Sequence, residues 1–257
     1  VYSLSIPLWV LNVIYPMKLP VDNLPVTDIV ATFSPMVAAS ILVYQEERLF
    51  GVKNLLKRTF DYKRITKKIW YVPIIFLMPF IYVLTYMIMR LVGLPVPTVW
   101  NPPLLTPLLF IVFFLAAAGE ELGYSGYVTD PMQVRYTALT ASLIIGLIHA
   151  DGISVDAFNG HDSGIVYMGR IYTGRKFPVL TVWLYNNTGK SVFAAILFHA
   201  VTNTGRSIFP GSRSAFQLYD GAIGYGLIAI TAVIVVFLWR SKTLIDLDML
   251  EKRREAG

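Results

Sequence analysis

The sequence predicts an all-α, polytopic membrane protein with about eight transmembrane helices. Apolar residues make up 55% of its 257 residues, only 15% are charged, and the mean hydropathy is +0.58. An ordinary soluble domain has roughly 45–50% apolar and about 25% charged residues. The apolar residues are also gathered into separate segments, several of which approach the roughly 20 residues that cross a hydrocarbon core of about 30 Å. These observations argue against a soluble globular domain.

Eight segments are candidate membrane spans, and they account for most of the chain. The third and the last are the most uniformly apolar, whereas the first is short and the sixth carries three basic residues. No internal repeat is visible, so a single helical transmembrane domain over residues 1–257 is the simplest organisation. In chain order the candidates cover roughly 1–16, 28–44, 69–93, 104–130, 137–150, 164–186, 189–208 and 221–240.

The basic residues predict the orientation of these spans. With eight spans, fifteen of the 22 Lys and Arg residues fall on one side, eight of them in the segment 45–68 and five in the tail from Arg240. Because positive charge is enriched in cytoplasmic loops, both termini are expected in the cytoplasm. We expect the membrane to be the plasma membrane of a prokaryote. The net charge of +6 is thus explained by topology, and no nucleic-acid partner is predicted. The absence of cysteine excludes disulfides, thiolate metal sites and cysteine nucleophiles.

A few polar residues interrupt the apolar segments and are candidates for function. Glu120 and Glu121 directly follow a long apolar run, and a carboxylate near the bilayer centre costs about 2.5–3.5 kcal/mol. His149 and His199 lie deep in later spans, and Asn203 follows His199 by four residues, which places both side chains on one helical face. An isolated histidine in such a helix is usually a packing or hydrogen-bonding residue, but this combination of groups indicates a site.

Counting along the helices predicts that these groups meet in a polar cavity near mid-membrane. At 1.5 Å per residue, eleven or twelve residues correspond to a depth of about 17 Å. Glu120 lies eleven residues from Pro131, where we expect the fourth helix to break. His149 lies twelve residues from Thr137, and His199 lies eleven residues from Thr188. Because neighbouring residues are about 100° apart around a helix, one Glu should face the cavity while the other holds a neighbouring helix.

Small residues next to the Glu pair predict a close helix contact. Gly119 and Gly123 have small-xxx-small spacing and lie beside Ala116 to Ala118. Without large side chains in between, another helix can approach this face closely. We interpret the two glycines as packing residues.

Three motifs in order resemble the CPBP (Abi) family of intramembrane proteases, which includes CAAX prenyl endopeptidases and bacteriocin-processing or immunity proteins. The family pattern is EExxxR on one helix, an apolar residue and then a His four positions later on the next, and HxxxN on a later helix. The resemblance covers about residues 104–205. The matching stretches are Glu120-Glu121-Leu-Gly-Tyr-Ser125, Ile145-Gly-Leu-Ile-His149 and His199-Ala-Val-Thr-Asn203.

The resemblance implies an intramembrane endopeptidase that cleaves a membrane-anchored protein or peptide, prenylated if the substrate is of the CAAX type. Glu120 and His149 would position the attacking water, and His199 and Asn203 would donate to the oxyanion. With Glu121 these are the candidate catalytic residues. No cofactor is implied, although Glu120, His149 and His199 could instead form a zinc site of the His₂Glu type with Glu121 as base. The sequence contains no HExxH motif, which favours the metal-free mechanism.

Two departures from the family pattern leave other functions open. Ser125 stands where the family usually has Arg, which puts in doubt one support of the Glu pair, and the residues after His149 lack the Pro-containing turn of many members. A non-catalytic immunity or scaffold protein with the same fold is therefore an alternative, and a transporter that uses Glu120 as a relay is a weaker one.

A serine mechanism is the remaining enzymatic alternative. Gly123-Tyr-Ser125-Gly126 matches the GxSG motif of rhomboid proteases, and His149 could serve as its base. In rhomboids, however, the HxxxN-type residues precede the serine, and the catalytic His follows it at a longer distance. Here the order is reversed and the two residues are 24 apart. The serine mechanism is therefore disfavoured.

Overall fold

The computed structural model describes residues 1–15, 30–94, 96, 104–149, 178–208 and 222–245; of His149 it describes the backbone alone. Every regular element in these ranges is helical, which confirms the all-α prediction. The α-helices are α1 (Tyr2–Ile14), α3 (Ser34–Lys57), α4 (Tyr71–Leu91), α5 (Thr106–Gly123), α6 (Thr129–Arg135), α7 (Ala138–His149), α10 (Pro178–Asn187), α11 (Val192–Ile208) and α13 (Ala222–Trp239). Short 3₁₀ turns η1 (Arg58–Phe60), η2 (Tyr62–Arg64) and η3 (Lys68–Trp70) connect α3 to α4, and a π-helix η4 (Tyr124–Val128) joins α5 to α6.

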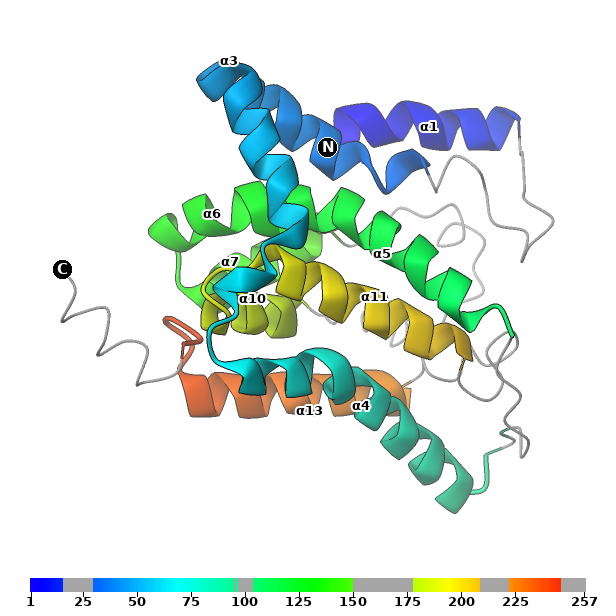
Figure 1. Cartoon of the computed structure of the whole chain (residues 1–257). Helices are drawn as coiled ribbons and strands as arrows, with labels where there is room; N and C mark the ends of the chain where they lie inside the picture. The colour runs from blue at the N-terminus through cyan, green and yellow to red at the C-terminus, as the bar shows by residue number, and fades with distance from the viewer. Residues whose placement is uncertain (16–29, 95, 97–103, 150–177, 209–221, 246–257) are drawn as a thin grey trace, which may run out of the picture.

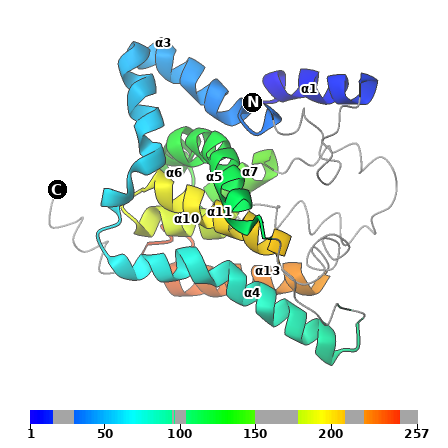
Figure 2. The ribbon, with the colours of Figure 1, turned by 45° about the vertical axis from the view of Figure 1, so that its right-hand side comes forward.

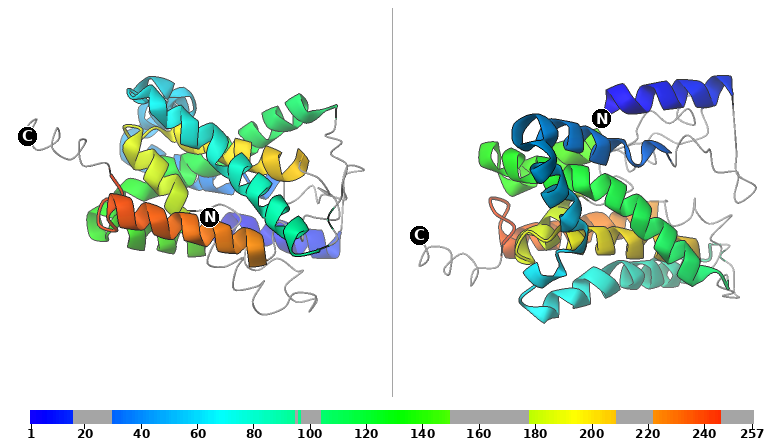
Figure 3. Two further views of the ribbon diagram at one scale, coloured as in Figure 1. Left: turned by 90° about the horizontal axis from the view of Figure 1, so that it is seen from below. Right: turned by 45° about the horizontal axis from the view of Figure 1, so that its top comes forward.

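The helices are arranged around α11. In Figure 1, α5 and α11 run side by side through the middle of the molecule, with α1 and the first part of α3 on one side of them. On the other side α4 and α13 lie next to each other (Figures 1 and 3). Helix α10 packs against both α7 and α11.

Two hydrophobic clusters meet on α11. Val192, Ile196 and Ala200, spaced four residues apart, pack with buried side chains of α3 and α5. Ala194 and Phe198 pack into a second cluster built from α4, α10 and α13. Since i and i+4 lie on one face of a helix, the two stripes point to different neighbours, and α11 is buried from both sides.

Helix α4 has one face toward the protein and one apolar face toward the outside. Ile74 and Met78 are fully buried in the cluster around α10 and α11. The opposite face exposes apolar side chains at intervals of three or four residues, each between 43% and 64% exposed: Val72, Phe76, Phe80, Val83 and Met87. A continuous apolar stripe of this kind suits a lipid environment better than water.

Two helices in the described residues are long and apolar enough to cross a membrane. One comprises η3 and α4 (Lys68–Leu91), and the other runs from α5 through η4 to the end of α6 (Thr106–Arg135). Shorter apolar helices occur at Ala138–Ile148 and Ile223–Trp239. Part of the sixth candidate span, residues 164–177, lies outside the described residues. The count of eight spans stays a prediction.

The glycines beside the Glu pair are packing residues, as predicted. A Cβ atom on Gly123 would lie 2.5 Å from the carbonyl carbon of Pro35, and one on Gly119 would lie 2.9 Å from the carbonyl oxygen of Thr32. Both contacts are with backbone atoms at the start of α3. The missing side chains therefore let α3 approach the end of α5 closely.

Two helices extend beyond the positions that the sequence suggested. Helix α3 continues past residue 44 to Lys57, and it changes direction at Arg48, whose φ of 59° is not helical (Figure 2). The fourth helix was expected to break at Pro131 but continues to Arg135. Pro131 is the third residue of α6 and closely follows the π-helix η4, and the helical stretch that begins with α5 passes through it to Arg135. Glu120 is thus fifteen residues from the observed helix end, and the depth count from Pro131 does not apply.

Candidate active site

Glu120 and Glu121 lie in the most buried part of α5. All residues from Ala117 to Gly123 are buried, and the two Glu residues are 6% and 2% exposed. Glycines on either side of the pair allow the start of α3 to pack tightly here, and α11 also packs against α5. Two carboxyl groups are thus held inside the helical assembly, where a charge is stable only if it is paired or hydrogen-bonded.

Glu121 connects α5 to α11 through His199. Its Oε1 lies 3.0 Å from Nδ1 of His199, and its Oε2 accepts a 2.5 Å hydrogen bond from the hydroxyl of Ser125. His199 is 5% exposed and Ser125 is 3% exposed. As expected, one member of the Glu pair holds a neighbouring helix, and that member is Glu121. Ser125, which replaces the Arg of the family pattern, still supplies a donor to the pair.

The contacts of Glu121 support one assignment of the proton on His199. We assign the Nδ1 proton to the bond with Glu121, because a carboxylate can accept at one oxygen from Ser125 and at the other from His199. Nε2 then accepts hydrogen bonds when the ring is neutral and donates only when the ring carries both protons. In this assignment Glu121 holds the orientation of the His199 ring.

The other predicted site residues are placed as follows. Glu120 is buried one position before Glu121, on a different side of α5. Asn203 lies on α11 one turn after His199 and is partly buried. His149 is the last residue of α7, and its side chain lies outside the described residues. The structure therefore brings Glu121 and His199 into contact, and the convergence of all five groups stays a prediction.

The predicted zinc alternative depends on the side chain of His149. Among the described residues, no three His, Cys, Asp or Glu side chains are arranged to hold a metal ion. The zinc alternative needs Glu120, His149 and His199 together, and the side chain of His149 is not among those described. It is kept as an alternative to be tested.

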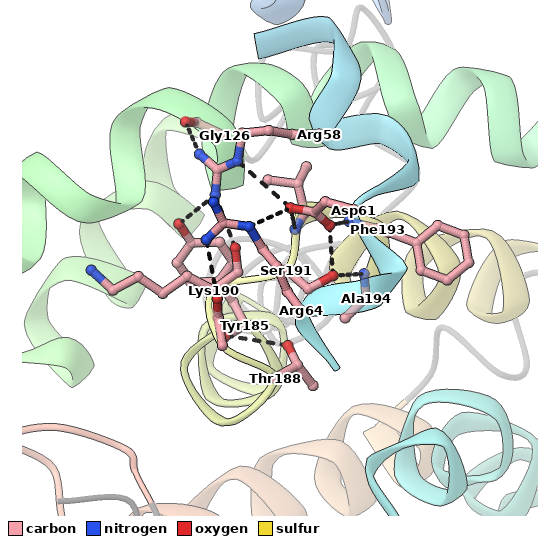
Figure 4. Close-up of polar contacts among 12 residues, drawn as sticks. Arg58, Asp61, Arg64, Gly126, Tyr185, Thr188, Lys190, Ser191, Phe193 and Ala194 are labelled. Carbon is pink, nitrogen blue, oxygen red and sulfur yellow. Dashed lines mark hydrogen bonds and ion pairs between the residues drawn. The ribbon is translucent and has the colours of Figure 1, made fainter. Parts of the chain in front are cut away.

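The π-helix η4 places a second polar network beside the site. A π-helical turn follows the Glu pair at Tyr124–Val128, and such turns are often found at functional sites. The carbonyl oxygen of Gly126 in this turn accepts a 2.7 Å hydrogen bond from Arg58, which comes from the connection between α3 and α4 (Figure 4). Asp61 from the same connection accepts from residues at the start of α11.

Sequence reasoning missed both residues of this network. Arg58 and Asp61 lie in the basic segment 45–68, which we interpreted only as a determinant of orientation. Their contacts reach residues about 130 positions away, so no local spacing could have predicted them. The contact of Ser125 with Glu121 does have a local signal, because the two residues are four apart in one helical stretch.

An all-helical protein with apolar outer faces and a buried carboxylate–imidazole pair belongs to the class of helical membrane proteins with an internal polar site. Comparison with known proteins is more specific. Residues 102–205 match the family model described as "Type II CAAX prenyl endopeptidase Rce1-like". A curated relative, CAAX prenyl protease 2 of Methanococcus maripaludis, is 24% identical over 222 residues, which cover 79% of this chain and 78% of the relative.

These matches confirm the resemblance to the CPBP family of intramembrane proteases of the CAAX prenyl endopeptidase type. The matched region contains all three predicted motifs. The comparisons support an endopeptidase of the CAAX type.

Proposed function

We propose that this protein is an intramembrane endopeptidase that hydrolyses a peptide bond of a membrane-anchored protein or peptide, with a prenylated CAAX-type C-terminus as its substrate class. The observation that carries the proposal is the buried contact between Glu121 and His199, because it joins two of the three motif helices within the region that matches the family. Burial of an ionisable pair at a helix contact is costly, and ionisable residues inside apolar segments are therefore candidates for function.

In the proposed mechanism Glu120 acts as the general base. With His149 it positions a water molecule and takes one of its protons as the water attacks the scissile carbonyl carbon. The tetrahedral intermediate carries its negative charge on the former carbonyl oxygen, which accepts hydrogen bonds from His199 and Asn203. The proton held by Glu120 then passes to the leaving amine as the C–N bond breaks. No metal ion is required.

Glu121 and Ser125 act through His199 in this mechanism. With the Nδ1 proton assigned to the bond with Glu121, Nε2 donates to the oxyanion when the ring carries both protons. A carboxylate at 3.0 Å is the partner that suits such a ring, and Ser125 holds the second oxygen of that carboxylate in place.

The test is cleavage of a farnesylated CAAX peptide by the purified chain in lipid nanodiscs. We expect Glu120→Gln and His149→Ala each to lower kcat by about 10²–10⁴, the usual contribution of general acid–base catalysis. Glu47→Gln, an exposed residue of α3, is the matched control and should cleave at the wild-type rate. Wild-type rates in both Glu120→Gln and His149→Ala would disprove the mechanism.

The same assay separates the remaining alternatives. Loss of activity with a chelator and recovery with zinc would establish the metal-dependent mechanism. Covalent labelling by a fluorophosphonate that disappears in Ser125→Ala would establish the serine mechanism. A wild-type protein that binds the peptide without turnover would indicate the non-catalytic immunity or scaffold function. The hydrogen bond from Ser125 to Glu121 favours the enzyme, since the support that the missing Arg put in doubt is present in another form.

A further inference from the structure

We propose that Arg58 and Asp61 are positioning residues for the peptidase site. Together they hold the helical stretch that carries Glu120 and Glu121 at a fixed position relative to the helix that carries His199. This inference rests on the proposed function, and neither residue belongs to the three motifs that carry the family resemblance. Figure 4 shows the two side chains facing each other between the π-helix and the turn before α11.

Arg58 ties the π-helix to the turn between α10 and α11. One terminal nitrogen donates to the carbonyl oxygen of Gly126 at 2.7 Å, five residues after Glu121. The other donates to the carbonyl oxygen of Lys190 at 2.9 Å and to the hydroxyl of Tyr185 at 3.0 Å. The planar guanidinium can make these bonds at once because its donors point in fixed, divergent directions.

Asp61 holds the first turn of α11. Its Oδ1 accepts from the hydroxyl of Ser191 at 2.7 Å and from the backbone N–H of Phe193 at 3.0 Å, and its Oδ2 accepts from the N–H of Val192 at 3.3 Å. The first N–H groups of a helix have no partner within it and carry partial positive charge, so a carboxylate is favoured there. Ser191 completes the cap by accepting from the N–H of Ala194.

The two side chains face each other as an ion pair, beyond hydrogen-bond distance. Nε of Arg58 lies 3.8 Å from Oδ2 of Asp61, and the side chains are only 21% and 10% exposed. The connection thus runs from Gly126 through Arg58 and Asp61 to the start of α11. His199 follows Val192 by seven residues, about two helical turns, so the position of this first turn determines where the imidazole meets Glu121.

Arg64 provides a matched control in the same connection. It has the same charge and also faces Asp61, at 3.5 Å, and it donates to the carbonyl oxygen of Gly189 at 3.3 Å. Its side chain is 52% exposed, and none of these contacts involves the π-helix. Removing Arg64 therefore changes the charge of the connection without releasing the stretch that carries the Glu pair.

The expected effect is on the chemical step. A displacement of about 1 Å between catalytic groups can cost about 10²-fold in rate, whereas distant contacts with the substrate are little affected. With farnesylated CAAX peptide and the full chain in nanodiscs, Arg58→Met should lower kcat at least tenfold and leave KM within twofold. Asp61→Ala should behave alike, and Arg58→Lys should be intermediate. Arg64→Met should stay within twofold of wild type in both constants.

A spectroscopic readout distinguishes positioning from a smaller folded fraction. Cleavage rates are divided by the concentration of monodisperse, folded protein. In protein labelled with ¹⁵N-histidine, the NMR signal of the His199 Nδ1 is recorded, and it is assigned by its absence in His199→Gln. The signal should shift in Arg58→Met and stay unchanged in Arg64→Met. If Arg58→Met does not fold, Arg58→Lys and Asp61→Asn must both lower kcat at unchanged KM.

Specific outcomes overturn the inference. A kcat of Arg58→Met within twofold of wild type would overturn it, and so would an equal loss of kcat in Arg64→Met. If Arg58→Met does not fold, a wild-type kcat in both Arg58→Lys and Asp61→Asn would overturn it. A wild-type protein that does not cleave the peptide would instead refute the proposed function. In that case the His199 signal still decides the inference: a shift confined to Arg58→Met supports it, and an unchanged signal refutes it.

Discussion

The hydroxyl of Ser125 shows how a small side chain can serve where the family pattern has a long cationic one. It donates to Glu121 at 2.5 Å, and Glu121 in turn contacts His199. An Arg would bring a full positive charge to this buried carboxylate, whereas a hydroxyl brings only a hydrogen bond. In this chain Glu121 is therefore held by two hydrogen-bonding partners, Ser125 and His199.

Ser125→Ala should lower kcat about tenfold while the protein still folds. A hydrogen bond to a charged group is worth about 1.5–3 kcal/mol, and its loss frees one oxygen of Glu121 to rotate away from His199. Ser125→Thr keeps the hydroxyl and should retain most of the activity. Steady-state cleavage of the CAAX peptide measures both. Equal rates for Ser125→Ala and wild type would show that Glu121 needs no support from this side.

The predicted site was recovered in part, for a physical reason. Counting along the helices predicted that the Glu pair and His199 approach each other. The count to Glu120 used a helix end that was wrong, yet the structure places Glu121 beside His199. Depth could not tell which Glu makes the contact, because the rotation of α5 is set by its packing on α3 at Gly119 and Gly123. Arg58 could not be predicted at all, since its partners come together only in the folded chain.

At the scale of elements, the contact between α5 and α3 is set by the absence of side chains. Helix α5 reaches the backbone of Thr32, Phe33 and Pro35 only because positions 119 and 123 carry no Cβ. Backbone atoms cannot move aside as the end of a flexible side chain can. The position of the Glu pair along α3 is thus fixed by close packing.

Gly123→Ala should destabilise the protein by about 1–3 kcal/mol, the typical cost of overpacking. The added Cβ would lie 2.5 Å from the carbonyl carbon of Pro35. Gly226→Ala in α13 is the matched control, because nothing lies within 4 Å of its added Cβ, and alanine favours helix more than glycine does. Thermal unfolding in detergent measures both, and a midpoint for Gly123→Ala equal to wild type would contradict the packing argument.

The sequence predicted some elements better than others. Residues 69–93 and 221–240 were expected as spans and contain α4 at Tyr71–Leu91 and α13 at Ala222–Trp239, because long apolar runs between polar ends leave few alternatives. Helix α3 extends past the predicted span 28–44 into the charged residues of segment 45–68. Those residues form helix readily, and Leu55 is buried in the cluster with α5 and α11.

At the scale of the whole molecule, the apolar outer faces and the distribution of charge together predict how the protein lies in a membrane. Helix α4 presents its apolar stripe outward. The basic connection from Arg58 to Lys68 lies at the N-terminal end of α4. Positive charge at one end of a span favours the cytoplasm for that end. Leu94, just beyond the other end of α4, should then face the opposite side of the membrane.

Cysteine labelling tests this orientation directly, since the chain contains no cysteine of its own. A cysteine introduced at Lys63 should react with a membrane-impermeant maleimide only after the cells are permeabilised. A cysteine at Leu94, which is 40% exposed, should react in intact cells. The cysteine-free parent chain is the control for background. The reverse pattern would place the basic connection outside and contradict the predicted topology.

The burial of α11 on two sides also limits how a substrate can enter. A helix that packs into separate clusters on each side cannot move without opening both of them. We therefore expect α11 to act as a fixed wall, and any opening that admits a lipid-anchored peptide must come from helices with a single packed face, such as α4. The rigid part of the molecule would then be the part that holds His199, and entry would be controlled at its periphery.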